Sequence, residues 1–311
     1  MNNKGFEFSF AWIFAIIVGA VVIFLAIYTT TSLIGNSRYE SDTKIAAQLQ
    51  SILSPIETNL EEGKSIVLGF SDETRIYNEC RNFGTFGEQK LSTATKSGIG
   101  KEWMEPGVAA KSSNKYIFSS KILQGKEIYV FVKPLKMPYK VADMMFMYTG
   151  KYCFVNPPND IEEEINDLQL PGITINNSEN CPLGSRKVCF SSSGCDIDVR
   201  FNVEDDSSGS VVKKEGTVRY ESGLIYGAIF SDFDVYGCQV ERLMKRNSEL
   251  AQLYAAKTNF LSGEGCSSNL AGDLISYSDS LKEADSGKLS FIKLLSDGLK
   301  EKNDRLNCKL F

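Results

Sequence analysis

One long segment near the N-terminus carries no charged side chain, and this feature constrains the fold most. Residues 8–37 contain no Asp, Glu, Lys or Arg, and their core, residues 8–28, reads FSFAWIFAIIVGAVVIFLAIY. As an α-helix these 21 residues would span about 31 Å, close to the hydrocarbon thickness of a bilayer. The segment lacks the polar stripe of a helix buried in a soluble protein, and Trp12 and Tyr28 lie near its ends, where amphipathic rings favour the membrane interface. We predict a transmembrane helix over residues 8–30.

A cleavable secretory signal is the alternative interpretation of this segment. Its apolar part would be shorter, about 7–15 residues, and would end at a small-x-small cleavage site. Here the apolar helix continues into TTTSLIGNS, which favours a retained single-pass anchor. The flanking basic residues do not fix its orientation, because Lys4 precedes the segment while Arg38 and Lys44 follow it.

Cysteine usage decides the orientation. All eight cysteines follow the apolar segment, at Cys80, Cys153, Cys181, Cys189, Cys195, Cys238, Cys266 and Cys308. None belongs to a CxxC pair, so neither a zinc ribbon nor a thioredoxin-like motif has support. An even number of scattered cysteines beyond an anchor indicates disulfides in an oxidising compartment, whereas eight buried free thiols in the cytosol are the alternative. We therefore expect a cytoplasmic leader over residues 1–7 and an extracytoplasmic remainder, with a glycosylation sequon at Asn176.

An amphipathic helix is expected to extend the anchor as a stalk over residues 31–63. Its apolar positions recur every three or four residues, at Ile45, Leu49, Ile52, Ile56 and Leu60. Pro55 interrupts this pattern, and Ser54, Pro55 and Glu57 together resemble a helix start with a capping box. The helix is therefore predicted to be either kinked or restarted at Ser54.

The middle of the chain, residues 64–236, is expected to be an antiparallel β-rich ectodomain. Residues 115–123 and 127–133 flank Gln124-Gly125 and are typical of a hairpin. Further strands are expected in segments rich in Val, Ile, Tyr and Phe, namely 144–155, 186–190, 196–203, 210–218 and 224–230. Residues 84–114 are expected to be a long loop. A turn over residues 191–194 would close another hairpin and bring Cys189 close to Cys195.

The last part of the chain, residues 237–311, has a helical period. It carries three apolar stripes joined by short links, which predict a helical hairpin or a three-helix unit that runs up, down and up. In that arrangement the end of the third helix meets the start of the second, so Cys266 should pair with Cys308. Cys238 would then reach back to the β region. The sequence leaves the other pairings open.

Composition and motifs speak against several kinds of chemistry. A formal net charge of −5 and a pI near 5.2 argue against nucleic-acid binding. The chain has no His, which excludes Ser-His-Asp and Cys-His catalysis and a His-ligated zinc. Residues 232–237 begin like a calcium loop but lack its later ligands, and the two S-x-x-K matches at residues 112–115 and 290–293 lack companion motifs. We expect no enzymatic activity, cofactor or metal; a His-independent hydrolase that uses two carboxylates is the less favoured alternative.

The first thirty residues resemble the N-terminus of type IV pilins and of related archaeal pilin-like proteins. The resemblance rests on Lys4-Gly5, on the following Phe6-Glu7-Phe8 and on the apolar helix. It implies that a membrane peptidase cuts between Gly5 and Phe6, that the helix packs into a filament core, and that a β-rich head follows. The glutamate typical of that family lies five residues after the cut, whereas Glu7 lies two residues after it. Small residues that allow close helix approach are present at Ala15, Gly19, Ala20 and Ala26.

The sequence thus predicts a disulfide-stapled α+β protein on a single transmembrane helix. Its expected role is that of an extracytoplasmic structural or adhesive surface protein, and the resemblance to pilins implies assembly into a filament through the N-terminal helix. A tethered binding protein, or an accessory subunit of an envelope complex, is the alternative. The expected partners are the lipid bilayer and other membrane or surface proteins, including further copies of the chain.

Overall fold

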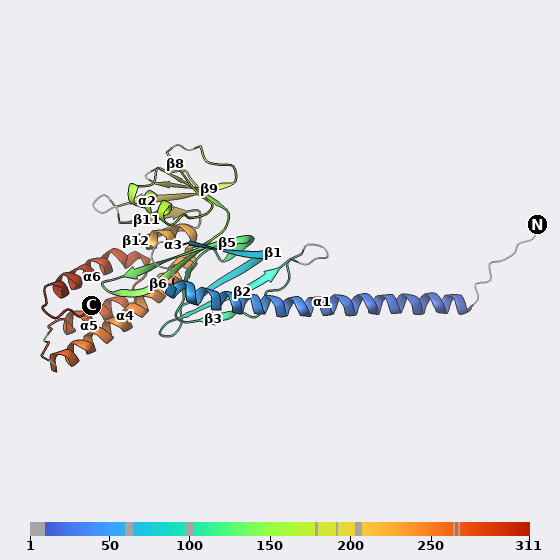
Figure 1. Ribbon diagram of the computed structural model, residues 1–311, viewed down its shortest axis with the longest axis horizontal. Helices are drawn as coiled ribbons and strands as arrows, with labels where there is room; N and C mark the ends of the chain where they lie inside the picture. The colour runs from blue at the N-terminus through green and yellow to red at the C-terminus, as the bar shows by residue number, and fades with distance from the viewer. Residues whose placement is uncertain are drawn as a thin grey trace, which may run out of the picture.

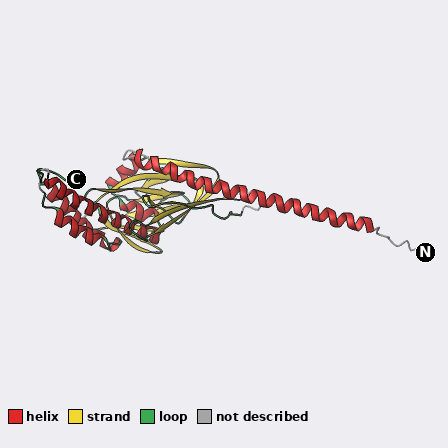
Figure 2. Cartoon of the chain, turned by 90° about the horizontal axis from the view of Figure 1, so that it is seen from below, coloured by secondary structure: helices red, strands yellow, loops and turns green. Residues whose placement is uncertain are grey.

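A long helix leads into a head built from two sheets and a group of C-terminal helices (Figure 1). The computed structural model describes residues 10–59, 65–96, 102–177, 180–190, 192–202, 207–263, 265–266 and 268–311. The C-terminus lies at the end of the head that is farthest from the free end of the long helix (Figures 1 and 2). The α+β class with an N-terminal apolar helix and C-terminal helices is therefore as predicted.

The described residues form six α-helices and two six-stranded sheets. The helices are α1 (Phe10–Asn59), α2 (Asn159–Asp167), α3 (Leu224–Phe230), α4 (Phe233–Gly263), α5 (Ala271–Leu281) and α6 (Leu289–Asp304). The first sheet has the spatial order β3 (Ala110–Ser112), β2 (Glu88–Thr95), β1 (Ser65–Arg81), β5 (Ile122–Lys136), β6 (Lys140–Tyr148) and β4 (Tyr116–Phe118). The second has the order β12 (Gly216–Glu221), β11 (Ser208–Lys213), β10 (Ile197–Phe201), β9 (Ser185–Phe190), β7 (Lys151–Val155) and β8 (Ile173–Asn176).

Helix α1 does not restart at Ser54, because the backbone stays helical through Pro55 to Asn59. The alternative expectation, a kink at Ser54, stays a prediction. The buried face of α1 is also turned relative to the predicted stripe. Leu49 is buried as expected, but Ile45 is only partly buried. The buried residues of this half are Asp42, Ala46, Leu49 and Leu53. The expected positions Ile52, Ile56 and Leu60 lie outside the residues whose side chains are described.

The first sheet buries both of its faces. Side chains alternate along β5, so Val130 and Phe131 point in opposite directions. Val130 belongs to the cluster that contains Leu49 and Leu53 of α1. Phe131 packs against Tyr226 and Phe230 of α3, with ring centroids 5.4 and 6.1 Å apart. The first sheet therefore joins the long helix to the rest of the head.

The second sheet is mixed, which corrects the antiparallel prediction for the middle of the chain. Strand β7 runs parallel to both β8 and β9, and β9 runs parallel to β10. Only β10, β11 and β12 form an antiparallel meander. The crossover from β7 to β8 contains α2, and parallel strands require a connection of that kind. Because β9 and β10 are parallel, residues 191–194 do not turn the predicted hairpin.

Strand β5 corrects the hairpin predicted around Gln124-Gly125. It is one strand that passes through both residues, where Arg75 pairs with Gln124 and Thr74 with Gly125 on β1. Strand β4 pairs with β6 in parallel instead. A glycine inside a long strand weakens it but does not require a turn, so the local signal was misleading.

Other segments of the predicted β region also differ. Residues 84–114, expected to be a loop, contain β2 and β3. Segment 144–155 is divided between β6 and β7 at Gly150, whose φ of +80° suits a tight turn. Segment 210–218 is divided between β11 and β12. Segment 224–230 is helix α3, whose seven side chains are all buried.

The C-terminal helices follow the prediction, although α4 begins at Phe233 rather than at residue 237. Helix α4 packs on the first sheet through Tyr236, whose ring lies 5.9 Å from that of Phe118 on β4. Helix α5 packs on α4, and α6 packs on α5 and on β12, at one side of the head (Figure 2). A short 3-10 helix, Ser286–Lys288, connects α5 to α6.

Candidate functional site

The first half of α1 presents an apolar surface that nothing in the head covers. Among the described residues, one helical segment, Trp12–Leu33, is long and apolar enough to cross a membrane, and none of it is buried inside the molecule. Trp12 and Phe24 are 68% and 67% exposed. Water disfavours a continuous apolar surface of this size. This segment is therefore the candidate membrane anchor.

Three small residues lie along one face of this segment. Ala15, Gly19 and Ala26 are separated by four and seven residues, which places them on one side of a helix with 3.6 residues per turn. Ala20 lies beside this face. A Cβ added at Gly19 would meet no atom within 4 Å, so the chain itself does not fill this surface. Small residues of this kind allow a second helix to approach closely.

The apolar segment is fixed to the head by a buried carboxylate. Asp42 of α1 is fully buried, and its Oδ2 accepts hydrogen bonds from the backbone N–H and the hydroxyl of Thr95 on β2, at 3.3 and 3.4 Å. Its carbonyl accepts a hydrogen bond from the Thr93 hydroxyl at 2.7 Å. A Cβ at Gly107 would lie 2.5 Å from the Thr43 nitrogen, so the backbone packs directly on the helix here. The second half of the helix is therefore packed and hydrogen-bonded onto the first sheet.

Four disulfides tie the head together, and they account for all eight cysteines. The pairs are Cys80–Cys238, Cys153–Cys181, Cys189–Cys195 and Cys266–Cys308. Cys189–Cys195 and Cys266–Cys308 are the two pairs favoured from the sequence. Cys238 reaches back to the β region as expected, where it joins α4 to β1. The links connect helix α4 to strand β1, strands β7 and β9 to nearby loops, and the α4–α5 connection to the C-terminal tail.

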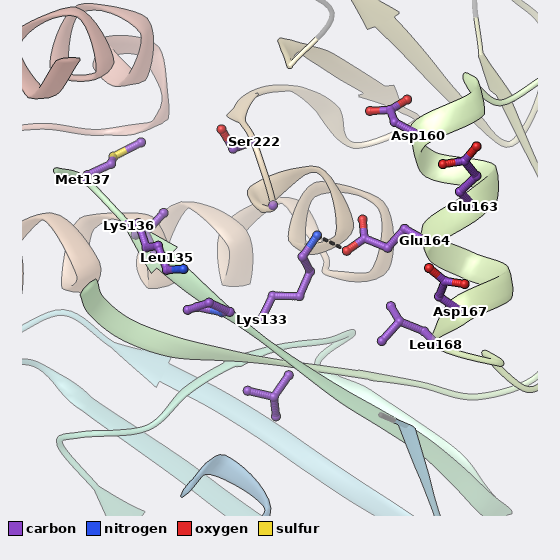
Figure 3. A pocket seen from close by; sticks show the side chains of 13 residues that line it. Lys133, Leu135, Lys136, Met137, Asp160, Glu163, Glu164, Asp167, Leu168 and Ser222 are labelled. Carbon is purple, nitrogen blue, oxygen red and sulfur yellow. Dashed lines mark ion pairs between the residues drawn. The ribbon is translucent and has the colours of Figure 1, made fainter. Parts of the chain in front are cut away.

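A cavity of about 660 Å³ opens between α2 and the end of β5 (Figure 3). Asp160, Glu163, Glu164 and Asp167 of α2 form one wall. The opposite wall comes from residues 132–137, which are the end of β5 and Met137. Four carboxylates on one short helix make this wall of the cavity acidic.

An ion pair crosses this cavity. The ammonium of Lys133 pairs with Glu164, and the hydroxyl of Tyr226 donates to the other oxygen of the same carboxylate at 2.7 Å (Figure 3). Burial raises the pKa of Tyr226 well above its usual value, with Glu164 adding to the effect, so the phenol stays protonated and remains a donor. Glu164 is thereby fixed, while Asp160, Glu163 and Asp167 are exposed.

No metal centre emerges from these carboxylates. Within the described ranges, no group of three or more His, Cys, Asp or Glu side chains is arranged to hold a metal ion. Residues 232–237 do not form a calcium loop. Asp232 accepts a hydrogen bond from the Lys121 backbone N–H at 2.7 Å, and Asp234 forms an ion pair with the Lys121 ammonium at 2.5 Å. These two carboxylates fix the start of α4 to the β4–β5 connection.

The remaining sequence candidates lie apart from these sites. Asn176 ends β8, and its side-chain amide donates to the Asn180 carbonyl at 2.6 Å. The proposed cleavage site, Gly5 and Phe6, lies outside the described residues. Ser112 ends β3 and its hydroxyl donates to the side-chain carbonyl of Asn114 at 2.6 Å, whereas Ser290 lies on α6. The S-x-x-K matches are therefore on different elements and far apart in the chain.

The sequence did not predict the cavity between α2 and β5, because its walls come from segments that are distant in the chain. The same reason applies to two small hollows between the sheets. Comparison with known proteins gives no match to a family model, to a curated protein or to a solved structure. The function is therefore inferred from the geometry of this chain.

Proposed function

We propose that this chain is a single-pass membrane-anchored protein whose disulfide-bonded head serves a structural or adhesive role on the outer side of the membrane. One observation carries the proposal: the exposed apolar segment Trp12–Leu33 continues without a break into a helix that is fixed in the head. Its 22 residues correspond to about 33 Å of helix, enough to cross the hydrocarbon core.

The four disulfides support the location of the head. Disulfides form and persist in oxidising compartments and are rare in a reducing cytosol. All of them lie on the C-terminal side of the apolar segment, so a head outside the cytoplasm requires a cytoplasmic N-terminus.

Alkaline carbonate extraction of membranes tests the anchor. The wild-type chain should stay in the pellet. A double variant, Gly19→Arg with Ile23→Arg, should be released, because each Arg near the middle of a bilayer costs about 3 kcal/mol on insertion scales. A matched double variant in the exposed part of α1, Glu40→Arg with Lys44→Arg, should remain in the pellet. Release of the wild-type chain by carbonate alone would contradict the proposal.

Assembly into a pilin-like filament is the second candidate function, and one observation favours it. The helix that carries the apolar face with Ala15, Gly19 and Ala26 also supplies Leu49 and Leu53 to the core of the head. Packing of identical apolar helices would therefore set the positions of the heads in a filament.

Cysteine cross-linking in native membranes tests this packing. The Gly19→Cys variant should form a disulfide-linked dimer. Ile17→Cys, on the opposite side of the helix, should form much less. Mass spectrometry of the native protein should find an N-terminus at Phe6. An intact Met1, or equal cross-linking at the two positions, would contradict assembly of this kind.

A further inference from the structure

Two small hollows lie side by side between the two sheets and share part of their lining. The first is about 140 Å³ and the second about 170 Å³. Ser120, Arg186 and Phe230 line both. Ser120 belongs to the β4–β5 connection of the first sheet, whereas Arg186 lies on β9 of the second. Each hollow has room for roughly five water molecules, which suits one small polar group and not a large ligand.

The two hollows together form the inter-sheet cleft. Basic side chains from several elements line it. Lys213 is partly buried in it and Arg186 is exposed at its edge, and Lys151 and Lys214 also line it. Among the described residues, neither Arg186 nor Lys213 forms an ion pair with a carboxylate. Arg186 contacts Tyr152, and the Lys213 ammonium donates to the carbonyl of Ser231. Both groups therefore keep donors for a ligand.

Three acidic side chains, Asp196, Glu215 and Asp232, also line the second hollow. Asp196 accepts a hydrogen bond from the Lys187 backbone N–H at 2.8 Å. Asp232 accepts one from the Lys121 N–H at 2.7 Å. Glu215 lies in the exposed turn between β11 and β12. Two of these three carboxylates thus already accept a hydrogen bond from a backbone N–H.

Burial lowers the pKa of Lys213 to about 8. Asp232 and Glu215 act in the opposite direction, while the positive charge of Arg186 lowers the pKa further. Asp196 and Lys214 also line this hollow. A lysine with this pKa changes its charge just above neutral pH, and a second negative charge beside it would favour the protonated form.

We propose that this cleft binds the oxyanion group of a small phosphate- or carboxylate-bearing molecule, with Arg186, Lys213 and Ser120 as donors. The planar guanidinium of Arg186 can donate two parallel hydrogen bonds to such a group, and the Lys213 ammonium adds a positive charge. The site does not depend on the membrane location of the protein, so it can be tested in detergent.

Calorimetric titration of the full chain in detergent tests the site. Inorganic phosphate and acetate are titrated separately at constant ionic strength and pH 7. Binding of phosphate alone assigns a phosphate-bearing ligand, and binding of acetate alone assigns a carboxylate. Lys213→Met and Arg186→Met should each weaken binding at least tenfold, whereas Lys282→Met, at an exposed lysine of the same protein, should leave it unchanged. No binding of either anion at millimolar concentration, or equal binding by Lys213→Met, overturns the proposal.

The pH dependence of anion affinity distinguishes a binding role of Lys213 from a purely structural one. Sulfate keeps a constant charge between pH 7 and pH 9, so it is the probe for this test. Its affinity for the wild-type chain should fall about tenfold as Lys213 loses its proton above its pKa of about 8. Lys213→Arg keeps the charge and should show a flat profile. Equal pH dependence in both proteins overturns the assignment of Lys213. Thermal unfolding of each variant confirms that it is folded.

Discussion

A buried arginine organises the polar interior of the head at the level of single residues. Arg242 of α4 is fully buried, and its guanidinium donates to the carbonyls of Phe86, Ser113 and Lys115 at 2.9–3.0 Å. It also donates to the Gln239 side chain at 2.9 Å. Burial lowers its pKa to about 10, so the side chain is still charged at neutral pH. One side chain thus joins α4 to carbonyls of two connections, β1–β2 and β3–β4.

Replacement of this arginine by an apolar side chain should be costly. Arg242→Met would leave several buried acceptors without a donor, at about 1–3 kcal/mol for each unsatisfied group. We expect a loss of roughly 3 kcal/mol in the free energy of unfolding, measured by urea titration of the detergent-solubilised chain.

The matched control for this prediction is Arg305→Met. Arg305 lies on the surface, with its side chain 75% exposed, and pairs only with Glu301 one turn away. Its replacement should change the free energy of unfolding by less than about 0.5 kcal/mol. Equal losses in the two variants would mean that the Arg242 network does not stabilise the head.

At the level of elements, the junction between α1 and β2 decides whether the anchor and the head are rigidly connected. Asp42 is the polar contact at this junction. Asp42→Ala should remove the acceptor of the Thr95 N–H and lower the stability of the β2 edge by about 1–2 kcal/mol. Hydrogen exchange at the Thr95 amide should become faster. Glu40→Ala, at an exposed position of the same helix, should leave that exchange rate unchanged, and an equal effect would refute the role of Asp42.

The disulfides should contribute unequally, because they close loops of different length. Cys80–Cys238 joins residues 158 positions apart, whereas Cys189–Cys195 joins residues six positions apart. In the chain-entropy treatment the first stabilises by about 5 kcal/mol and the second by about 2 kcal/mol. Replacing both cysteines of each pair by Ser should therefore cost about 3 kcal/mol more for the first pair. Urea unfolding of the two double variants measures the difference, and a larger loss for the second pair would contradict it.

Local patterns predicted some elements well and others poorly, for physical reasons. The apolar segment was recognised by its length and its lack of charged residues, and the C-terminal helices by their long helical period. Segment 224–230, LIYGAIF, was taken for a strand because an apolar run buried on all sides has no period. Its helical form depends on tertiary packing, since a Cβ at Gly227 would lie 2.5 Å from the ring of Phe118.

For most of the distant cysteines and strands, the sequence did not predict which ones pair with each other. The cysteine count predicted disulfides, and helix geometry gave Cys266–Cys308, but the partner of Cys80 depends on how α4 crosses the first sheet. The parallel order of β7, β9 and β10 likewise arises from crossovers that no local turn signal encodes. Arg186, Lys213 and Ser120 come from β9, β11 and the β4–β5 connection, so their cleft was equally invisible in the sequence.

At the scale of the whole molecule, a long helix whose first half is apolar leads directly into a disulfide-bonded head (Figure 1). In the proposed function, the apolar segment attaches the protein to the membrane, the buried face around Asp42, Ala46 and Leu49 joins this segment to the head, and the disulfides cross-link the head. This arrangement suits a protein that presents a rigid surface at a constant distance from a membrane. We therefore regard the location of the head as the central claim.

Labelling of intact cells with a membrane-impermeant lysine reagent, followed by peptide mapping, tests that claim most directly. Lys111, Lys282 and Lys302 are well placed as reporters, because their side chains are 57–60% exposed on the head. All three should be labelled in intact cells to the same extent as after the membrane has been permeabilised. Labelling of these lysines only after permeabilisation would contradict an extracytoplasmic head.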